Sequence, residues 1–187
     1  MKFEKTTIPN LLVLTPDRFQ DDRGFFSETW SHRAMEVAGL KYDFVQDNQS
    51  MSTQAGTVRG LHFQAPPHAQ AKLVRCGRGC LLDVAVDIRR GSPTFGRWVS
   101  EELSFENGKQ LLIPAGFLHG FVSRQPDTEI IYKCSDYYSP ECDGAIRFDD
   151  PDIGIDWGVS EDVAVLSDKD RAAPFFRDFD TPFTYEG

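Results

Sequence analysis

The sequence contains no apolar run that approaches the ~20 residues needed to cross a membrane. Its first residues, Met1–Lys5, also lack the apolar core of a secretory signal peptide. Basic residues are in the minority, since 20 Lys and Arg face 29 Asp and Glu, which gives a net charge of −9. An acidic chain of this kind is not typical of a nucleic-acid binder. We therefore expect neither a membrane nor a nucleic acid as partner, although locally clustered arginines would still suit a phosphorylated ligand.

Cysteine is scarce, and the four cysteines present form no CxxC pair. Without an export signal they are most simply free thiols in a reducing compartment, so we expect a cytoplasmic protein. A disulfide between two of them is the alternative. The four are Cys76, Cys80, Cys134 and Cys142.

Long helical patterns are missing as well, and short strand-like runs divided by Gly, Pro and Asn take their place. One helix is expected over 31–39, with Ser31 as its N-cap and Met35 and Ala38 on its buried face. One or two helical turns are expected after residue 160. Many short strands predict an all-β jelly-roll barrel whose mouth is the usual ligand site. The strand-like runs are 11–14, 24–29, 44–50, 57–64, 71–76, 81–88, 97–103, 110–113, 120–123 and 129–135.

One turn has a specific signature. Asn107–Gly108 suits the two positive-φ positions of a type I′ turn, so 97–103 and 110–113 are expected to pair as a hairpin. Among the strands, 81–87 alternates over its second half and sets Asp83, Ala85 and Asp87 on one face.

The chain has few histidines, and the four present do not form a metal motif. Metal-binding jelly rolls use two histidines one residue apart, followed by a glutamate and a third histidine. His62 is followed by Phe63 and Gln64, and no acidic residue comes near it until Asp83. We therefore expect no metal site, and a metal-dependent cupin enzyme remains an alternative.

The run Val58–Gln64 is the most informative part of the chain, because it places Arg59 and His62 inside a strand-like segment. A buried histidine can simply be a hydrogen-bonded core residue, or it can be a general base facing a pocket. Positions 59 and 62 point to opposite faces of an ideal strand. A twist or bulge near Gly60 would let both side chains face the same cavity.

Three other side chains could accompany His62. Lys72 shares a strand face with Val74 and Cys76, so it either meets an anion or extends to solvent at the barrel rim. Tyr132 lies inside another strand-like run, where packing is the simpler role. His119 follows a strand end and a turn.

Ten segments in order along the chain resemble the dTDP-4-dehydrorhamnose 3,5-epimerase family, over roughly residues 3–175. The resemblance implies one epimerase domain over residues 1–187, a cupin-type jelly roll that is homodimeric and uses no metal or nicotinamide cofactor. The segments are Asp21–Phe26, Phe44–Asn48, Arg59–Gln64, Lys72–Arg75, Asp83–Arg89, Ser92–Gly96, Ile113–Phe117, His119–Phe121, Tyr137–Pro140 and Leu166–Asp170.

The resemblance also implies catalytic roles. The substrate would be a dTDP-linked 4-keto-6-deoxyglucose, epimerised at C3 and C5 through an enolate on the route to dTDP-L-rhamnose. His62 would be the base and Asp170 its orienting carboxylate, a role that nothing local to Asp170 indicates. Tyr132 would be the acid on the far face of the sugar. Lys72 would hydrogen-bond the ketone oxygen and hold the enolate charge.

Eleven further positions are implied as substrate contacts. Arg23 and Arg59 would grip the pyrophosphate, and Phe26 or Tyr138 would stack on the thymine. This chain has Asp143 where the family usually has glutamate, so the shorter side chain puts that contact in question. The full set is Arg23, Phe26, Glu28, Gln46, Asp47, Asn48, Arg59, His119, Tyr138, Asp143 and Lys169.

Three other functions remain open at this point. Relatives that epimerise C3 alone or C5 alone share the histidine–carboxylate pair and differ in the acid and the ring pocket. A metal-dependent cupin oxygenase or isomerase would hold a stoichiometric metal. A non-catalytic module would bind the sugar nucleotide without turnover.

Overall fold

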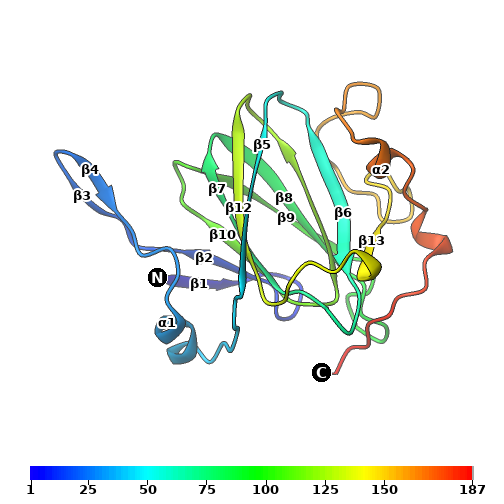
Figure 1. The fold of residues 1–187 in the computed structure, drawn as a ribbon, viewed down its shortest axis with the longest axis horizontal. Coiled ribbons are helices and arrows are strands. Elements are labelled where there is room, and N and C mark those ends of the chain that lie inside the picture. The colour runs from blue at the N-terminus through cyan, green and yellow to red at the C-terminus, as the bar shows by residue number, and fades with distance from the viewer. Residues whose placement is uncertain (187) are drawn as a thin grey trace.

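A computed structural model describes residues 1–186 and contains two antiparallel β-sheets that pack face to face (Figure 1). The expected all-β jelly-roll class is confirmed. The six-stranded sheet runs β1 (Lys2–Lys5), β2 (Leu12–Thr15), β10 (Gln110–Ile113), β7 (Lys72–Arg78), β12 (Thr128–Cys134) and β5 (Gln46–Ser52). The five-stranded sheet runs β13 (Asp143–Ala145), β6 (Val58–Gln64), β11 (Phe117–Ser123), β8 (Cys80–Asp87) and β9 (Trp98–Ser104).

The main core lies between the two sheets. Val74 and Ile130 reach it from the six-stranded sheet, and Leu81 and Leu103 reach it from the five-stranded sheet. Alternation along each strand sends these side chains inward, and each fully buried one contributes roughly 1.5–3 kcal/mol. The apolar filling stops short of one end, where polar side chains from both sheets line the interior.

A second core covers the outer face of the five-stranded sheet. Leu61, Val84 and Leu118 point outward from β6, β8 and β11 and meet Phe148 and Trp157 of the C-terminal segment. Both faces of β8 and β11 are thus buried, which suits the largely apolar sequences of these two strands. Figure 1 shows the same C-terminal segment, orange to red, passing beside β6 with helix α2 (Asp168–Arg171).

Helix α1 (His32–Val37) closes a third, smaller core on the outer face of the six-stranded sheet. Ser31 is its N-cap as expected, since its side chain accepts from the backbone N–H of Ala34 at 3.4 Å. Met35 is buried, but Ala38 is exposed, so that part of the predicted helix face is wrong. The turns expected after residue 160 are α2 and a 3₁₀ turn over Phe176–Asp178, and another 3₁₀ turn covers Pro140–Cys142. None of the helices within residues 1–186 is both long and apolar enough to cross a membrane.

The hairpin predicted at Asn107–Gly108 is wrong. β9 and β10 belong to different sheets, so this turn carries the chain from one sheet to the other. Gly108 has a positive φ of 63°, but Asn107 does not adopt the positive φ that a type I′ turn requires. Instead, Asn107 Oδ1 accepts hydrogen bonds from the backbone N–H groups of Ser104 and Lys109 at 3.1 and 2.9 Å.

The irregularity predicted near Gly60 is confirmed. His62 pairs with His119, and Arg59 pairs with Phe121. Between these two pairs β6 contains one more residue than β11, which is a β-bulge. Gly60 has φ +122°, and a Cβ there would lie 2.6 Å from the Cα of Gly120. Glycine is therefore required at this point, and the bulge turns Arg59 and His62 toward one cavity.

A two-stranded ribbon, β3 (Phe19–Asp21) with β4 (Gly24–Phe26), stands apart from both sheets and points away from the barrel (Figure 1). The strand expected over 24–29 is thus shorter than predicted, and β1, β3 and β13 were not anticipated. Phe26 is 70% exposed on this arm, although its residue type prefers burial. An exposed apolar arm of this kind indicates a contact surface.

Candidate active site

A cavity of about 460 Å³ opens at the polar end of the barrel interior. A neighbouring cavity of about 480 Å³ shares His62, Lys72, Tyr132 and Lys169 with it, so the two form one continuous cleft. Both sheets and helix α2 contribute to its walls. Side chains with titratable or hydrogen-bonding groups lining the cleft are Gln46, Asn48, Ser50, Thr57, Arg59, His62, Gln64, Gln70, Lys72, His119, Tyr132, Tyr138, Asp143, Ser167, Lys169 and Asp170.

His62 and Asp170 form a hydrogen-bonded pair at the centre of this cleft. His62 Nε2 lies 2.5 Å from Asp170 Oδ1, and the carboxylate is only 4% exposed. Ser167 caps α2 and donates from Oγ to Asp170 Oδ2 at 2.7 Å. Burial raises the pKa of Asp170, but the hydrogen bonds from His62 and Ser167 outweigh it, so the pKa falls below its ordinary value. Asp170 is therefore an anion that orients the imidazole.

Lys72 and Tyr132 face this pair from the opposite sheet. They lie on the adjacent strands β7 and β12, and Lys72 Nζ is 6.0 Å from the centre of the Tyr132 ring. Burial lowers the pKa of Lys72 and raises the pKa of Tyr132. Tyr132 thus keeps its proton at neutral pH and can donate it. A base and an acid on opposite walls can act on the two faces of one bound ring.

Arg59 and His119 lie beside the pair. The Arg59 Nη2 donates to the carbonyl oxygen of Met51 at 3.2 Å, which aims the guanidinium along the cleft wall. His119 is 8% exposed, and its Nε2 lies 2.8 Å from Asp83 Oδ1. The cleft thus holds two histidines, each oriented by its own carboxylate.

The neighbouring cavity collects five of the eleven expected substrate contacts, which are Gln46, Asn48, Tyr138, Asp143 and Lys169. Gln46 Nε2 donates to Asn48 Oδ1 at 3.0 Å on β5. Lys169 forms an ion pair with Asp143, and the Tyr138 hydroxyl donates to the same carboxylate at 3.4 Å. The Tyr138 ring is largely exposed, which leaves its face open for stacking.

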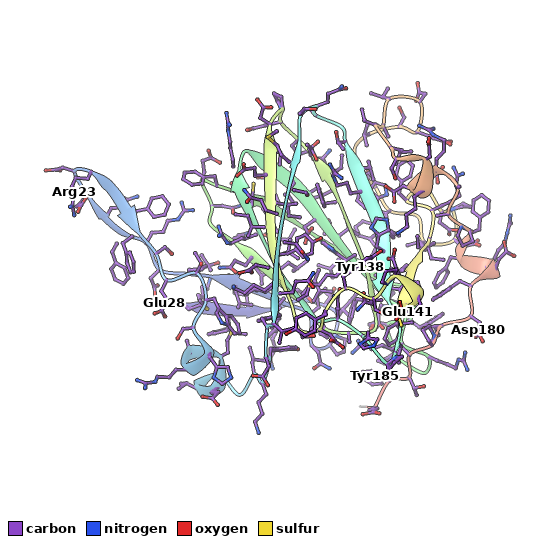
Figure 2. The ribbon with its side chains drawn as sticks, viewed as in Figure 1. Arg23, Glu28, Tyr138, Glu141, Asp180 and Tyr185 are labelled. Carbon is purple, nitrogen blue, oxygen red and sulfur yellow. The ribbon has the colours of Figure 1, made fainter. Side chains whose placement is uncertain are left out.

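Four of the expected contacts do not reach the cleft within one chain. Asp47 points to the other face of β5 from Gln46 and Asn48, and binds Lys133 Nζ at 3.0 Å. Arg23, Phe26 and Glu28 lie on or beside the β3–β4 arm, and Figure 2 shows Arg23 and Glu28 on the opposite side of the molecule from Tyr138.

Several residues at the site were not anticipated, among them Gln70 and Ser167 in the cleft wall and the buried Asp83 behind His119. Ser167 would have been visible as an N-cap, because Ser167 and Asp170 have the spacing of a capping box, although that pattern predicts only a helix start. Asp83 was noted for its strand face, and a carboxylate among inward apolar residues was the available signal of a buried partner.

Comparison with known proteins shows which family this chain resembles. The profile of a family described as dTDP-4-dehydrorhamnose 3,5-epimerase matches residues 5–178. Curated relatives of that name from Sinorhizobium fredii and Salmonella typhimurium are 49% identical over 185 residues and 52% identical over 171 residues. These alignments cover 99% and 91% of this chain, and 94% and 92% of the relatives.

A solved structure is also similar over the full length. It is the dTDP-6-deoxy-D-glucose-3,5-epimerase of Legionella pneumophila in complex with dTDP-4-keto-L-rhamnose. The two chains share 43% identity with a TM-score of 0.93, covering 100% of this chain and 99% of that one.

Replacing Asp170 by asparagine tests the pair through stability. Because the pKa of Asp170 is lowered on folding, its contribution is present above its unfolded pKa and is lost as pH falls through the folded value. We expect Asp170→Asn to lose about 1.5–3 kcal/mol of unfolding free energy at pH 7, the usual contribution of a hydrogen bond to a charged group. In urea titrations, the difference in unfolding free energy between Asp170→Asn and the unsubstituted protein should become smaller toward pH 3.

The exposed Asp168 of the same helix provides the control. Asp168→Asn should change stability by less than about 0.5 kcal/mol at either pH. If the loss of unfolding free energy in Asp170→Asn is the same at pH 7 and pH 3, Asp170 is not an ionised partner of His62.

Proposed function

The chain belongs to the dTDP-4-dehydrorhamnose 3,5-epimerase family, and from this membership we propose that it converts dTDP-4-dehydro-6-deoxy-D-glucose into dTDP-4-dehydro-L-rhamnose. It is then an isomerase that acts on a nucleotide sugar. The observation that carries the proposal is the His62–Asp170 pair facing Tyr132 and Lys72 across one cleft.

The chemistry requires this arrangement of groups. C3 and C5 flank the C4 ketone, so removing a proton from either carbon leaves an enolate whose charge rests on the ketone oxygen. Inversion requires that a proton leave one face of the ring and that another arrive on the opposite face. A base on one wall and an acid on the other, with a cation at the ketone oxygen, supply all three needs.

His62 is the proposed base. Its Nε2 is held by Asp170, so Nδ1 is the ring nitrogen available to take the proton. The anionic Asp170 stabilises the imidazolium that forms and keeps the ring in one orientation, as in other histidine–carboxylate pairs.

Lys72 and Tyr132 are the proposed partners on the six-stranded sheet. The Lys72 ammonium stabilises the enolate oxygen, and one such preorganised donor contributes on the order of 3–4 kcal/mol to the transition state. Tyr132 returns a proton from its wall. Charge stabilisation and both proton transfers then come from side chains, so the proposed mechanism uses no metal and no nicotinamide.

Binding groups extend along the cleft from the reacting ring. Arg59 supplies a planar fork for the pyrophosphate, and His119 contacts the sugar. The exposed ring of Tyr138 stacks on the thymine, close to Gln46 and Asn48. Lys169 and Asp143, which pair with each other, contact the far end of the ligand. Asp47 faces away from the cleft and has no place in this proposal.

The arm supports a homodimer. Arg23 and Phe26 stand away from the barrel that carries them, and the Arg23 side chain is 89% exposed. In a symmetric dimer the same arm can reach the cleft of the second copy and bring Arg23, Phe26 and Glu28 to its nucleotide end. Each site would then be completed by the other subunit, with Arg23 joining Arg59 at the pyrophosphate.

Two further expectations belong with this proposal. Residues 1–187 are taken as one epimerase domain, since the family profile runs from 5 to 178. A cytoplasmic location suits the four cysteines, which are all free thiols.

Proton exchange is the direct test of function. We expect catalytic amounts of the protein in deuterium oxide to remove the C3 and C5 proton signals of dTDP-4-dehydro-6-deoxy-D-glucose, as followed by NMR. His62→Ala should abolish both losses and retain dTDP binding. Loss of one signal alone would make the protein a single-site epimerase, and no exchange with intact dTDP binding would make it a binding module.

Tyr132→Phe tests the acid. The substitution removes the hydroxyl and keeps the ring, so we expect turnover to fall more than ~10²-fold, the usual scale for losing a general acid. Steady-state kinetics with the same substrate provides the measurement. A rate close to that of the unsubstituted protein would remove Tyr132 from this role.

Subunit complementation tests the exchanged arm. His62→Ala and Arg23→Ala chains with different affinity tags are co-expressed, and the mixed dimer is purified. If the arm acts on the partner, one of the two sites has both residues intact, and the mixed dimer regains roughly half of the wild-type activity. If the arm acts within its own chain, each site keeps one defect and activity stays at the level of the separate variants.

A further inference from the structure

Asp83 is a buried carboxylate that no step of the proposed mechanism uses. It lies on β8, on the inward face, and none of its surface is exposed. Its Oδ1 lies 2.8 Å from His119 Nε2. Its Oδ2 is buried and has no hydrogen-bond partner among residues 1–186. A carboxylate oxygen in that position is costly unless a positive charge lies close by.

Lys72 supplies the matching charge. No ion pair within the described residues includes Lys72, although burial strips its ammonium of water and lowers its pKa. Negative charge nearby opposes that effect and raises the pKa of Lys72. It comes from Cys134, which acts only as a thiolate, and then from Asp83 and Asp143. Lys72 and the ring of His119 line the same cavity, and Asp83 holds that ring from behind. The unpaired oxygen and the unpaired ammonium therefore lie in one buried region of the barrel, although no direct ion pair joins them.

The other anionic groups near Lys72 are already engaged. Asp143 is paired with Lys169, and Asp170 is held by His62 and Ser167. Burial raises the pKa of Cys134, so it remains a neutral thiol at physiological pH. Asp83 is therefore the carboxylate left to balance Lys72.

We propose that Asp83 is a positioning residue of this epimerase, which holds the ring of His119 through one oxygen and keeps the Lys72 ammonium charged through the other. The inference rests on the proposed function, because Lys72 matters there as the cation that receives the enolate. His62–Asp170 and His119–Asp83 are then two histidine–carboxylate pairs with different tasks. The first pair transfers a proton, and the carboxylate of the second pair keeps Lys72 on the opposite sheet charged.

A pH dependence follows from this arrangement. Lys72 stabilises the enolate only while it carries its proton, so turnover falls as pH rises through its pKa. Removing the charge of Asp83 lowers that pKa further, and the fall in turnover moves to lower pH. The other titratable or charged groups lining the cleft around Lys72 are Cys134 and Tyr132 on β12, Arg59 and His62 on β6, His119 on β11, Asp143 on β13, and Lys169 and Asp170 on α2. On the β9 side Asp83 is paired in register with Glu101, which binds Lys109 Nζ at 2.5 Å.

The test is the pH profile of kcat for Asp83→Asn, measured by proton exchange between pH 6 and pH 10. Asparagine has the shape of aspartate and can still accept from His119, so the change removes mainly the charge. We expect the alkaline limb to move down by about one pH unit, the smaller end of the effect of an opposite charge. The Kd for dTDP should stay within about twofold, since Asp83 does not line the cleft.

Asp87 provides a matched control. It is equally buried on the same strand and face, but its carboxylate binds Arg89, Ser92 and Thr94, away from the cleft. Asp87→Asn should lower the urea midpoint and leave the alkaline limb in place. An unshifted limb in Asp83→Asn with intact dTDP binding would overturn the inference, as would an equal shift in Asp87→Asn.

A double variant covers the case in which Asp83→Asn folds poorly. If Asp83 and Lys72 balance each other, Lys72→Met with Asp83→Asn should unfold at a higher urea concentration than either single variant, because no buried charge is left alone. Additive losses would reject the pairing. If the unsubstituted protein shows no proton exchange at C3 or C5, the proposed function is wrong. If it shows normal exchange but Asp83→Asn leaves the alkaline limb of the pH profile unshifted, only this inference is wrong.

Discussion

The hydrogen bond between His62 and Asp170 joins two parts of the chain that are 108 residues apart, and the cleft depends on it. His62 is set by the bulged strand β6, and Asp170 is delivered by a four-residue helix that has little stability of its own. That helix stays in place because the C-terminal segment packs its apolar side chains on the outer face of the five-stranded sheet. The second core is thus what brings the carboxylate to the histidine.

The division of the cleft between two sheets suits the proposed mechanism, which needs groups on both faces of a sugar ring. The five-stranded sheet contributes His62 and His119, and the six-stranded sheet contributes Lys72 and Tyr132. Rigid strands hold the two walls apart at a separation set by the packing of the apolar core between them. Burial then shifts the pKa values of these groups. It raises the pKa of Tyr132, which keeps the hydroxyl protonated, and lowers the pKa of Lys72, whose charge then depends on nearby carboxylates.

Local patterns predicted most strands, the capped helix at Ser31 and the bulge near Gly60, because alternation, capping and strand parity act over a few residues. The same reasoning could have excluded Asp47, whose neighbours Gln46 and Asn48 face inward on a regular strand. The local prediction of a hairpin failed at Asn107–Gly108, because this turn joins two strands that belong to different sheets. Local reasoning also did not anticipate β1, β3 and β13, whose pairing depends on partner strands elsewhere in the chain.

The sequence by itself determined the class of fold and, through ordered family motifs, singled out polar side chains on β6, β7 and β12 that line the cleft. Tertiary structure decided which of those side chains meet. Asp170 becomes a partner of His62, and Asp83 a partner of His119, only when segments far apart in the chain pack together. A hydrogen bond or a charge interaction depends on distance and burial in space, and a local sequence pattern specifies neither for residues a hundred positions apart.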